Sequence, residues 1–180
     1  MSEAPIIPDD KMLLELAWQT GQALKDNTLK LVSAESCTGG WIGQIITAIS
    51  GSSDWYDRGF ITYSNLSKQQ MLRVQLLTLT QFGAVSEQTA REMAQGALTM
   101  SQAQIAVSVT GIAGPSGGSA EKPVGTVCFA WVLKTALIKS ANSRTCHLSG
   151  DREAIRRQSV AIALQGTLGL LENTLPLNFA

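Results

Sequence analysis

Residues 29–40 read LKLVSAESCTGG and contain the first clear signal of the chain's architecture. Its first half, residues 29–34, is a short apolar run of the kind that forms a buried strand. Two glycines end the stretch, and residues 41–49 then carry apolar side chains at helical spacing. A buried strand that turns at once into a helix is the beginning of an α/β unit.

The rest of the chain continues this alternation. Further strands are predicted at residues 58–63, 104–109, 125–133 and 137–147. Further helices are predicted from Asp9 or Asp10 to about Leu24, at 65–75, from Ser86 to about Met100, and from Asp151 onwards. The last two strands follow each other without a helix, so the sheet cannot be wholly parallel. The sequence therefore predicts a three-layer α/β/α fold with a mixed, mostly parallel central sheet. No linker divides the chain, and we expect one domain over residues 1–180 with its core at about 10–173.

The charge balance excludes binding to nucleic acid or anionic lipid through bulk electrostatics. Lys and Arg number 14, Asp and Glu also number 14, and charged residues make up only 16% of the 180 residues. A polyanion is held by an excess of basic residues, which this chain lacks. One or two arginines can still hold a small anion. We therefore expect a small-molecule substrate, no nucleic acid and no membrane as partners. The low charge content also leaves room for a buried interface, so we expect a homodimer.

Cysteine and histidine are too sparse for a metal site or a disulfide framework. Cys37, Cys128 and Cys146 form no C-x-x-C pair, and His147 is the only histidine. We expect no metal and no cofactor, and a Ser-His-Asp triad would have to use His147. We expect no secretory signal at the N-terminus, and no apolar run approaches the ~20 residues of a membrane span. A cytoplasmic location is expected.

The first candidate site is the segment AESCTGG, residues 34–40, at the carboxyl end of a predicted strand. Ligands of open α/β sheets bind at such ends. Free N–H groups at the following helix start can stabilise a phosphate or a developing oxyanion. Ser36 or Cys37 could be a nucleophile. The structural alternative is that Ser36 or Thr38 caps the helix while Cys37 packs in the core.

The second candidate site is YSNLSK, residues 63–68, at the end of the next strand. A lysine acts as a base when desolvation or a nearby cation lowers its pKa. A Ser-Lys pair can activate a hydroxyl without histidine. The alternative is that Asn65 caps a helix and Lys68 is a solvated surface lysine.

The third candidate site is the glycine-rich loop TGIAGPSGG, residues 110–118. Its backbone N–H groups could approach an anion closely. The alternative is a mobile surface loop.

The fourth candidate site is GDREAIRR, residues 150–157, at the start of a predicted helix. Arg152 and Arg156 are four residues apart and so lie on one helical face, where guanidinium groups suit phosphate or carboxylate. The alternative is a salt-bridged helix start, capped by Asp151.

Together these segments resemble the nicotinamide-nucleotide amidase family, equivalently the C-terminal domain of the CinA competence/damage-inducible proteins. The resemblance covers about residues 10–173, with several uncommon motifs in register. The matching segments are AESCTGG (34–40), DRGFITYSNLSK (57–68), GAVSEQTAREMA (83–94), SVTGIAGPSGG (108–118), KPVGTV (122–127) and GDREAIR (150–156).

The resemblance implies hydrolysis of the carboxamide of nicotinamide mononucleotide to nicotinate mononucleotide and ammonia, in pyridine nucleotide salvage and without a metal. It implies Ser36 as nucleophile, Lys68 as general base and Tyr63 as a residue that orients both. It further implies that Arg152 or Arg156 takes the 5′-phosphate. The substrate-binding residues carried over by the match are Glu35, Cys37, Thr38, Gly39, Gly40, Asn65, Thr110, Gly111, Gly114, Arg152 and Arg156.

One residue departs from the family pattern, and two other functions compete with the amidase. Trp41 stands where a smaller aliphatic residue is expected. A nucleotide-binding or regulatory module without catalysis would bind ligand and release no ammonia. A phosphatase or phosphotransferase would suit the glycine-rich loop and the arginines, but the chain lacks the clustered acids that hold Mg²⁺.

Overall fold

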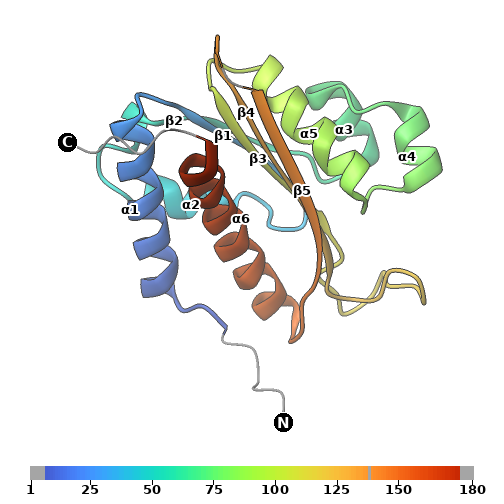
Figure 1. The fold of residues 1–180 in the computed structure, drawn as a ribbon. Helices are drawn as coiled ribbons and strands as arrows, with labels where there is room; N and C mark the ends of the chain where they lie inside the picture. Colours follow the sequence, from blue (N-terminus) through green and yellow to red (C-terminus); the bar gives the residue numbers. More distant parts are fainter. Residues whose placement is uncertain (1–6, 138, 175–180) are drawn as a thin grey trace.

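A computed structural model describes residues 7–137 and 139–174 as a mixed sheet between two layers of helices (Figure 1). The strands lie in the order β2-β1-β3-β4-β5. β1 pairs in parallel with β2 and β3, whereas β4 is antiparallel to both of its neighbours. Of these strands, all but β4 run in the same direction, which confirms the predicted mixed α/β fold. Their bounds are β1 (Leu31–Glu35), β2 (Tyr56–Ile61), β3 (Ile105–Gly111), β4 (Thr126–Lys134) and β5 (Lys139–His147).

Helices cover both faces of the sheet (Figure 1). One face carries α1 (Asp10–Asp26), α2 (Trp41–Thr47) and α6 (Arg152–Thr174); a short 3₁₀ helix, η1 (Ser52–Asp54), precedes β2. The other face carries α3 (Asn65–Leu72), α4 (Leu76–Phe82) and α5 (Glu87–Thr99). On this face α5 packs directly on the sheet, and α3 and α4 pack against α5. In the described ranges, no helix is both long enough and apolar enough to pass through a membrane.

The central strands are buried on both faces. Along β3, Val107 and Val109 pack in the cluster that includes α1 and α6, whereas Ala106 packs in the cluster that includes α5. Ser108, on the α5 side, donates its hydroxyl to Ala90 O at 2.6 Å. Side chains that alternate between two buried faces explain why apolar residues occur at successive positions of this strand.

One helix was not predicted from the sequence. The helix predicted at 65–75 ends at Leu72, because Arg73 adopts the left-handed conformation with φ 59°. α4 then begins at Leu76. Its start is held by Glu92 of α5, which accepts from the N–H of Gln75 at 2.7 Å and from the hydroxyl of Thr78 at 2.6 Å. Since this support comes from a distant residue, the local pattern could not reveal it.

Candidate active site

Ser36 lies at the carboxyl end of β1, between the ends of β2 and β3. Its N–H donates to Val109 O at 3.0 Å, and the N–H of Thr62 donates to Glu35 O at 2.8 Å. These bonds tie the end of β1 to both neighbouring strands. Ser36 is thereby fixed at the edge of the sheet where ligands of parallel α/β sheets bind.

The amine of Lys68 lies beside the hydroxyl of Ser36. Lys68 Nζ donates to Ser36 Oγ at 3.0 Å and to Thr62 O at 2.8 Å. Lys68 is in the second turn of α3, whose first turn is fixed by a capping box between Ser64 and Ser67. The alternative of a solvated surface lysine is wrong, because Lys68 is only 1% exposed.

The electrostatic setting of this amine favours its neutral form. Burial lowers the pKa of Lys68, since leaving water disfavours the charged ammonium. In the described part of the chain no carboxylate lies within ion-pair distance of Nζ. Burial also raises the pKa of the adjacent Cys37 thiol to about 12, so this thiol is uncharged at neutral pH. A lysine of lowered pKa next to a serine hydroxyl is suited to general-base activation.

Glu35, the last residue of β1, caps helix α2 with its side chain. The carboxylate is 1% exposed. It accepts hydrogen bonds from the hydroxyl groups of Thr38 at 2.7 Å and Ser33 at 3.3 Å. It also accepts from the N–H groups of Gly40 at 3.0 Å, Ile42 at 3.1 Å and Gly43 at 2.9 Å. Contrary to the expectation from the sequence, these N–H groups of α2 are therefore occupied and cannot bind an oxyanion. Neither Ser36 nor Thr38 caps this helix.

Two other N–H groups next to Ser36 are not bound by a carboxylate, although the N–H of Cys37 interacts with its own thiol. The N–H groups of Cys37 and Thr38 donate to no oxygen atom of the described residues, whereas the N–H of Gly39 donates to Ser36 O at 3.0 Å. The N–H of the residue after a nucleophile is a common part of an oxyanion hole. Gly39 and Gly40 then adopt positive φ values of 63° and 97°, which allow the chain to turn into α2.

Arg152 connects two other segments of the candidate site. Its Nη1 donates to Gly114 O at 2.7 Å and its Nη2 donates to the hydroxyl of Tyr63 at 3.0 Å. Tyr63 is 63% exposed. The structure thus brings Tyr63 to Arg152 and forms no hydrogen bond from its hydroxyl to Ser36 or Lys68.

Arg156 reaches a different segment, although it lies one turn further along the same helix. Its Nε donates to Cys37 O at 3.1 Å and its Nη2 donates to Thr38 O at 2.8 Å. The two arginines of the predicted pair therefore have different partners. Asp151, before them, caps α6 by accepting from the N–H of Ala154 at 2.8 Å.

The remaining predicted residues lie at the rim of this arrangement or have structural contacts. The hydroxyl of Thr110 is buried and donates to Ala84 O at 2.7 Å. Gly111 is the last residue of β3. Asn65 is the exposed first residue of α3, and Ser64 rather than Asn65 is the helix cap. Thr62 was missed by sequence reasoning, because its contribution is a main-chain carbonyl that no side-chain pattern reveals.

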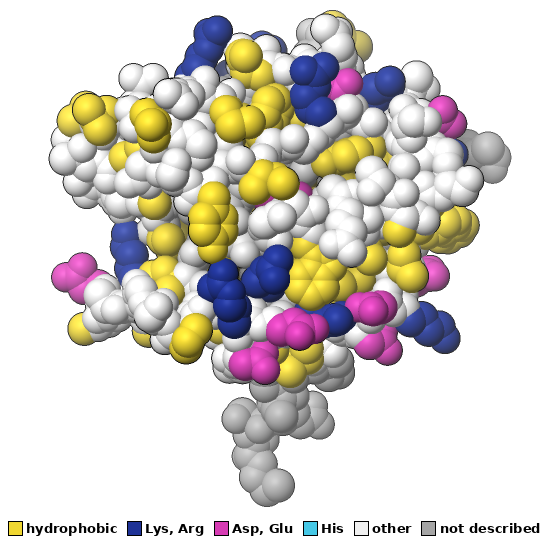
Figure 2. All heavy atoms as spheres, turned by 180° about the vertical axis from the view of Figure 1, so that it is seen from behind, with side chains coloured by type: hydrophobic (Ala, Val, Ile, Leu, Met, Phe, Trp, Pro, Cys, Tyr) yellow, Lys and Arg dark blue, Asp and Glu magenta, His cyan; other side chains and the backbone are white. Residues whose placement is uncertain are grey.

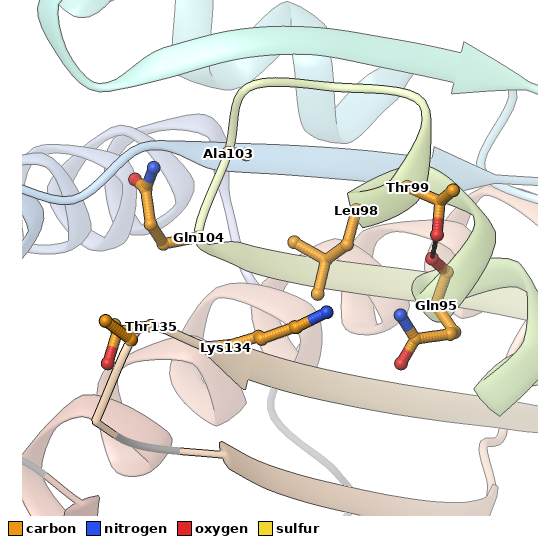
Figure 3. A pocket seen from close by; sticks show the side chains of 8 residues that line it. Gln95, Leu98, Thr99, Ala103, Gln104, Lys134 and Thr135 are labelled. Carbon is orange, nitrogen blue, oxygen red and sulfur yellow. Dashed lines mark hydrogen bonds between the residues drawn. The ribbon is translucent and has the colours of Figure 1, made fainter.

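The site lies apart from the hollow drawn in Figure 3. That pocket of about 470 Å³ is at the other end of the sheet, where β4 ends and β3 begins, and no predicted site residue lines it. Ile61 at the end of β2 and Leu66 on α3 are exposed apolar side chains. On the face in Figure 2, basic side chains lie beside apolar ones. Among the described residues, no group of three or more His, Cys, Asp or Glu side chains could hold a metal ion.

Comparison with known proteins places this arrangement in a family. The model of the CinA C-terminal domain matches residues 13–171. The chain is 55% identical to the nicotinamide-nucleotide amidohydrolase PncC of Escherichia coli K12, over 87% of this chain and 93% of the relative. It is 44% identical to the protein of the same name from Pseudomonas putida, over 86% and 94%. The crystal structure of the competence/damage inducible protein CihA from Agrobacterium tumefaciens superposes with a TM-score of 0.85 at 45% identity, over 93% and 99% of the two chains. The chain therefore belongs to the CinA C-terminal domain family.

Proposed function

We propose that this chain hydrolyses the carboxamide of nicotinamide mononucleotide to nicotinate mononucleotide and ammonia. The name of two relatives, nicotinamide-nucleotide amidohydrolase, supports this choice of substrate. The observation that carries the chemistry is the 3.0 Å contact between the buried Lys68 amine and the Ser36 hydroxyl. A serine hydroxyl is a weak nucleophile unless a base lies within hydrogen-bond reach, and Lys68 fills that position.

In the first half of the reaction, Ser36 Oγ bonds to the amide carbon and its proton moves to the neutral amine of Lys68. The electron pair of the carbonyl bond moves onto the oxygen, and the N–H groups of Cys37 and Thr38 bind this oxyanion. When the intermediate collapses, the carbon–nitrogen bond breaks. Lys68 returns its proton to the leaving nitrogen, which departs as ammonia and leaves an ester on Ser36.

In the second half, water attacks the ester carbon and Lys68 accepts a proton from the water. Collapse of the second intermediate breaks the bond to Ser36 Oγ, which takes the proton back from Lys68. The product forms as the carboxylic acid of nicotinate mononucleotide, which loses its proton to solvent and leaves as the carboxylate. The same lysine thus acts as base and as acid in each half, without a metal ion.

Substrate binding is assigned to the exposed rim of the site. Arg152 is exposed and lies between Gly114 of the glycine-rich loop and Tyr63, so it is the residue that we assign to the 5′-phosphate. Tyr63 is assigned to the substrate side of this pair rather than to the orientation of Lys68.

We further propose that residues 10–173 act as one catalytic domain, in the cytoplasm and in pyridine nucleotide salvage. The exposed apolar side chains of α4, Leu76 and Leu77, would be covered in a homodimer, and the mass in solution tests this against the 19.2 kDa chain.

The test is ammonia release from nicotinamide mononucleotide, with and without excess EDTA. Ser36→Ala and Lys68→Met should each abolish nearly all turnover, and the double variant should be hardly slower, because the two residues act as one unit. Ser50→Ala and Lys11→Met are matched controls at exposed positions, and both should remain active. Binding without ammonia release by the unaltered protein would favour a regulatory module. Activity lost in EDTA and restored by a divalent ion would refute the metal-free mechanism.

A further inference from the structure

The hydrogen bonds of Arg156 fix the orientation of two peptide planes that follow Ser36. A trans peptide is planar, and its C=O and N–H point in opposite directions. The C=O of Cys37 and the N–H of Thr38 belong to one such plane. Arg156 Nε donates to Cys37 O at 3.1 Å and so fixes this plane. The Thr38 N–H on its opposite side donates to no oxygen of the described residues.

The next plane is held at both ends. Arg156 donates to Thr38 O at 2.8 Å, and the N–H of the same peptide, that of Gly39, donates to Ser36 O at 3.0 Å. The C=O of Ser36 and the N–H of Cys37 belong to the preceding peptide, so the hydrogen bond from Gly39 to Ser36 O orients the Cys37 N–H in the opposite direction. The segment is therefore anchored through its carbonyl groups, while the N–H of Thr38 is left for a ligand.

We propose that Arg156 is a positioning residue of the amidase reaction, which holds the Thr38 N–H in the orientation that binds the oxyanion formed when Ser36 attacks the amide. The proposal rests on the proposed function and gives Arg156 a role other than phosphate binding. Two of its three guanidinium nitrogens already donate to backbone carbonyls of this segment. Arg152, with its exposed side chain, retains the phosphate role.

Trp41 holds Arg156 from the other side. The Cζ atom of Arg156 lies 5.1 Å from the centre of the Trp41 ring, and that of Arg157 lies 5.0 Å from it. A guanidinium over an indole face is attracted to it and loses freedom to turn away. The tryptophan that departs from the family pattern thus packs against the arginine that orients the peptide. We expect Trp41→Leu to lower kcat only a few-fold, since both hydrogen bonds remain.

Kinetics of Arg156→Gln and Arg157→Gln separate the possible roles. Arg157 is the matched control: it contacts the same ring, but its hydrogen bonds go to Asp10 and Glu153. Loss of one oxyanion donor costs roughly 10²–10³ in kcat, so loss of its positioning should cost ~10–100-fold. In Arg156→Gln this loss should be equal for nicotinamide mononucleotide and its riboside, with KM nearly unchanged. Arg156→Lys should recover part of it, because an ammonium can still reach one carbonyl. The pH midpoint of kcat should move little, since the lowered pKa of Lys68 is caused mainly by burial, which the variant leaves in place.

Amide hydrogen exchange gives a second readout that does not depend on turnover. The Gly39 N–H should exchange faster in Arg156→Gln than in Arg157→Gln, because its peptide is no longer held at the carbonyl. An effect on KM for the mononucleotide alone would make Arg156 a phosphate ligand and overturn the proposal. Unchanged exchange at Gly39 would also overturn it, even in a protein that released no ammonia. Absence of ammonia release from the unaltered protein, together with faster exchange in the variant, would refute only the proposed substrate.

Discussion

Glu35→Gln is expected to destabilise the protein strongly although it changes one atom. The carboxylate receives N–H groups from Gly40, Ile42 and Gly43 and is almost fully buried. In the variant, the amide oxygen can replace Oε2 and keep the bonds to Gly40 and Ile42. The new NH₂ group then faces the N–H of Gly43, and two donors cannot bond to each other.

The magnitude follows from these contacts. A buried donor left without an acceptor costs about 1–3 kcal/mol. Loss of the negative charge at the start of α2 costs up to about 2 kcal/mol in a partly buried geometry. A neutral amide is cheaper to bury than a carboxylate, which offsets part of this sum. We therefore expect the free energy of unfolding to fall by about 2–4 kcal/mol, and the melting temperature to fall by about 4–16 °C for a domain of this size.

Urea unfolding followed by circular dichroism measures the effect. Asp9→Asn is the matched control, because Asp9 caps α1 from an exposed position through the N–H of Met12. Asparagine is as good a cap as aspartate, so the control should change stability by less than about 0.5 kcal/mol. A Glu35→Gln protein within about 1 kcal/mol of the unaltered protein would refute the capping argument.

Three further predictions concern packing and reactivity. Gly96→Ala should lower the free energy of unfolding by about 1–3 kcal/mol, because a Cβ there would lie 1.9 Å from Leu72 O. Gly169→Ala is the control: it has open space around it and should stabilise α6 by about 1 kcal/mol. Urea unfolding compares the two variants, and an equal effect on stability would contradict the close contact at Gly96. Thr62→Val should stabilise the fold by about 1 kcal/mol, because the buried Thr62 Oγ1 has no hydrogen-bond partner among the described residues, and a destabilised variant in the same assay would show that the hydroxyl is bonded. Cys37→Ala should keep kcat within about threefold in the ammonia assay, and an inactive but folded variant would assign the nucleophile to the thiol.

The sequence predicted the elements that carry a local signal. Mostly apolar segments predicted the buried strands β1, β3 and β4. The N-cap residues Asp9 and Ser86 predicted the starts of α1 and α5. The pairing of Ser36 with Lys68 was expected from the family resemblance, and in the structure β1 and β2 are parallel neighbours, so that the segments after them meet and bring Lys68 to Ser36. That proximity follows from topology and needs no knowledge of side-chain contacts.

The contacts that decide the orientation of groups within the site could not be predicted. Arg156 and Cys37 are 119 residues apart in the sequence, and the acceptor is a main-chain carbonyl. The helical spacing of Arg152 and Arg156 placed them on one face but did not show that they reach different segments. Glu35 was expected among the substrate-binding residues, yet most of its donors are N–H groups, which every residue type except proline supplies.

The buried amine of Lys68 should leave a pH-dependent signature in stability. Burial lowers its pKa in the folded state, so between the folded and the unfolded pKa the unfolded chain binds more protons. The free energy of unfolding contributed by this group therefore rises with pH across that window, by about 1.4 kcal/mol for each pH unit that separates the two pKa values. Lys68→Met removes the titrating group; the variant is expected to have no amidase activity, but only its stability is measured here. The stability of the unaltered protein relative to Lys68→Met should thus increase from neutral pH towards pH ~10.4, the unperturbed lysine pKa, whereas Lys11→Met at an exposed site should show no such trend. Urea unfolding at a series of pH values measures the difference. A relative stability that is constant with pH, or that decreases, would mean that Lys68 is charged in the folded protein and could not take the proton of Ser36.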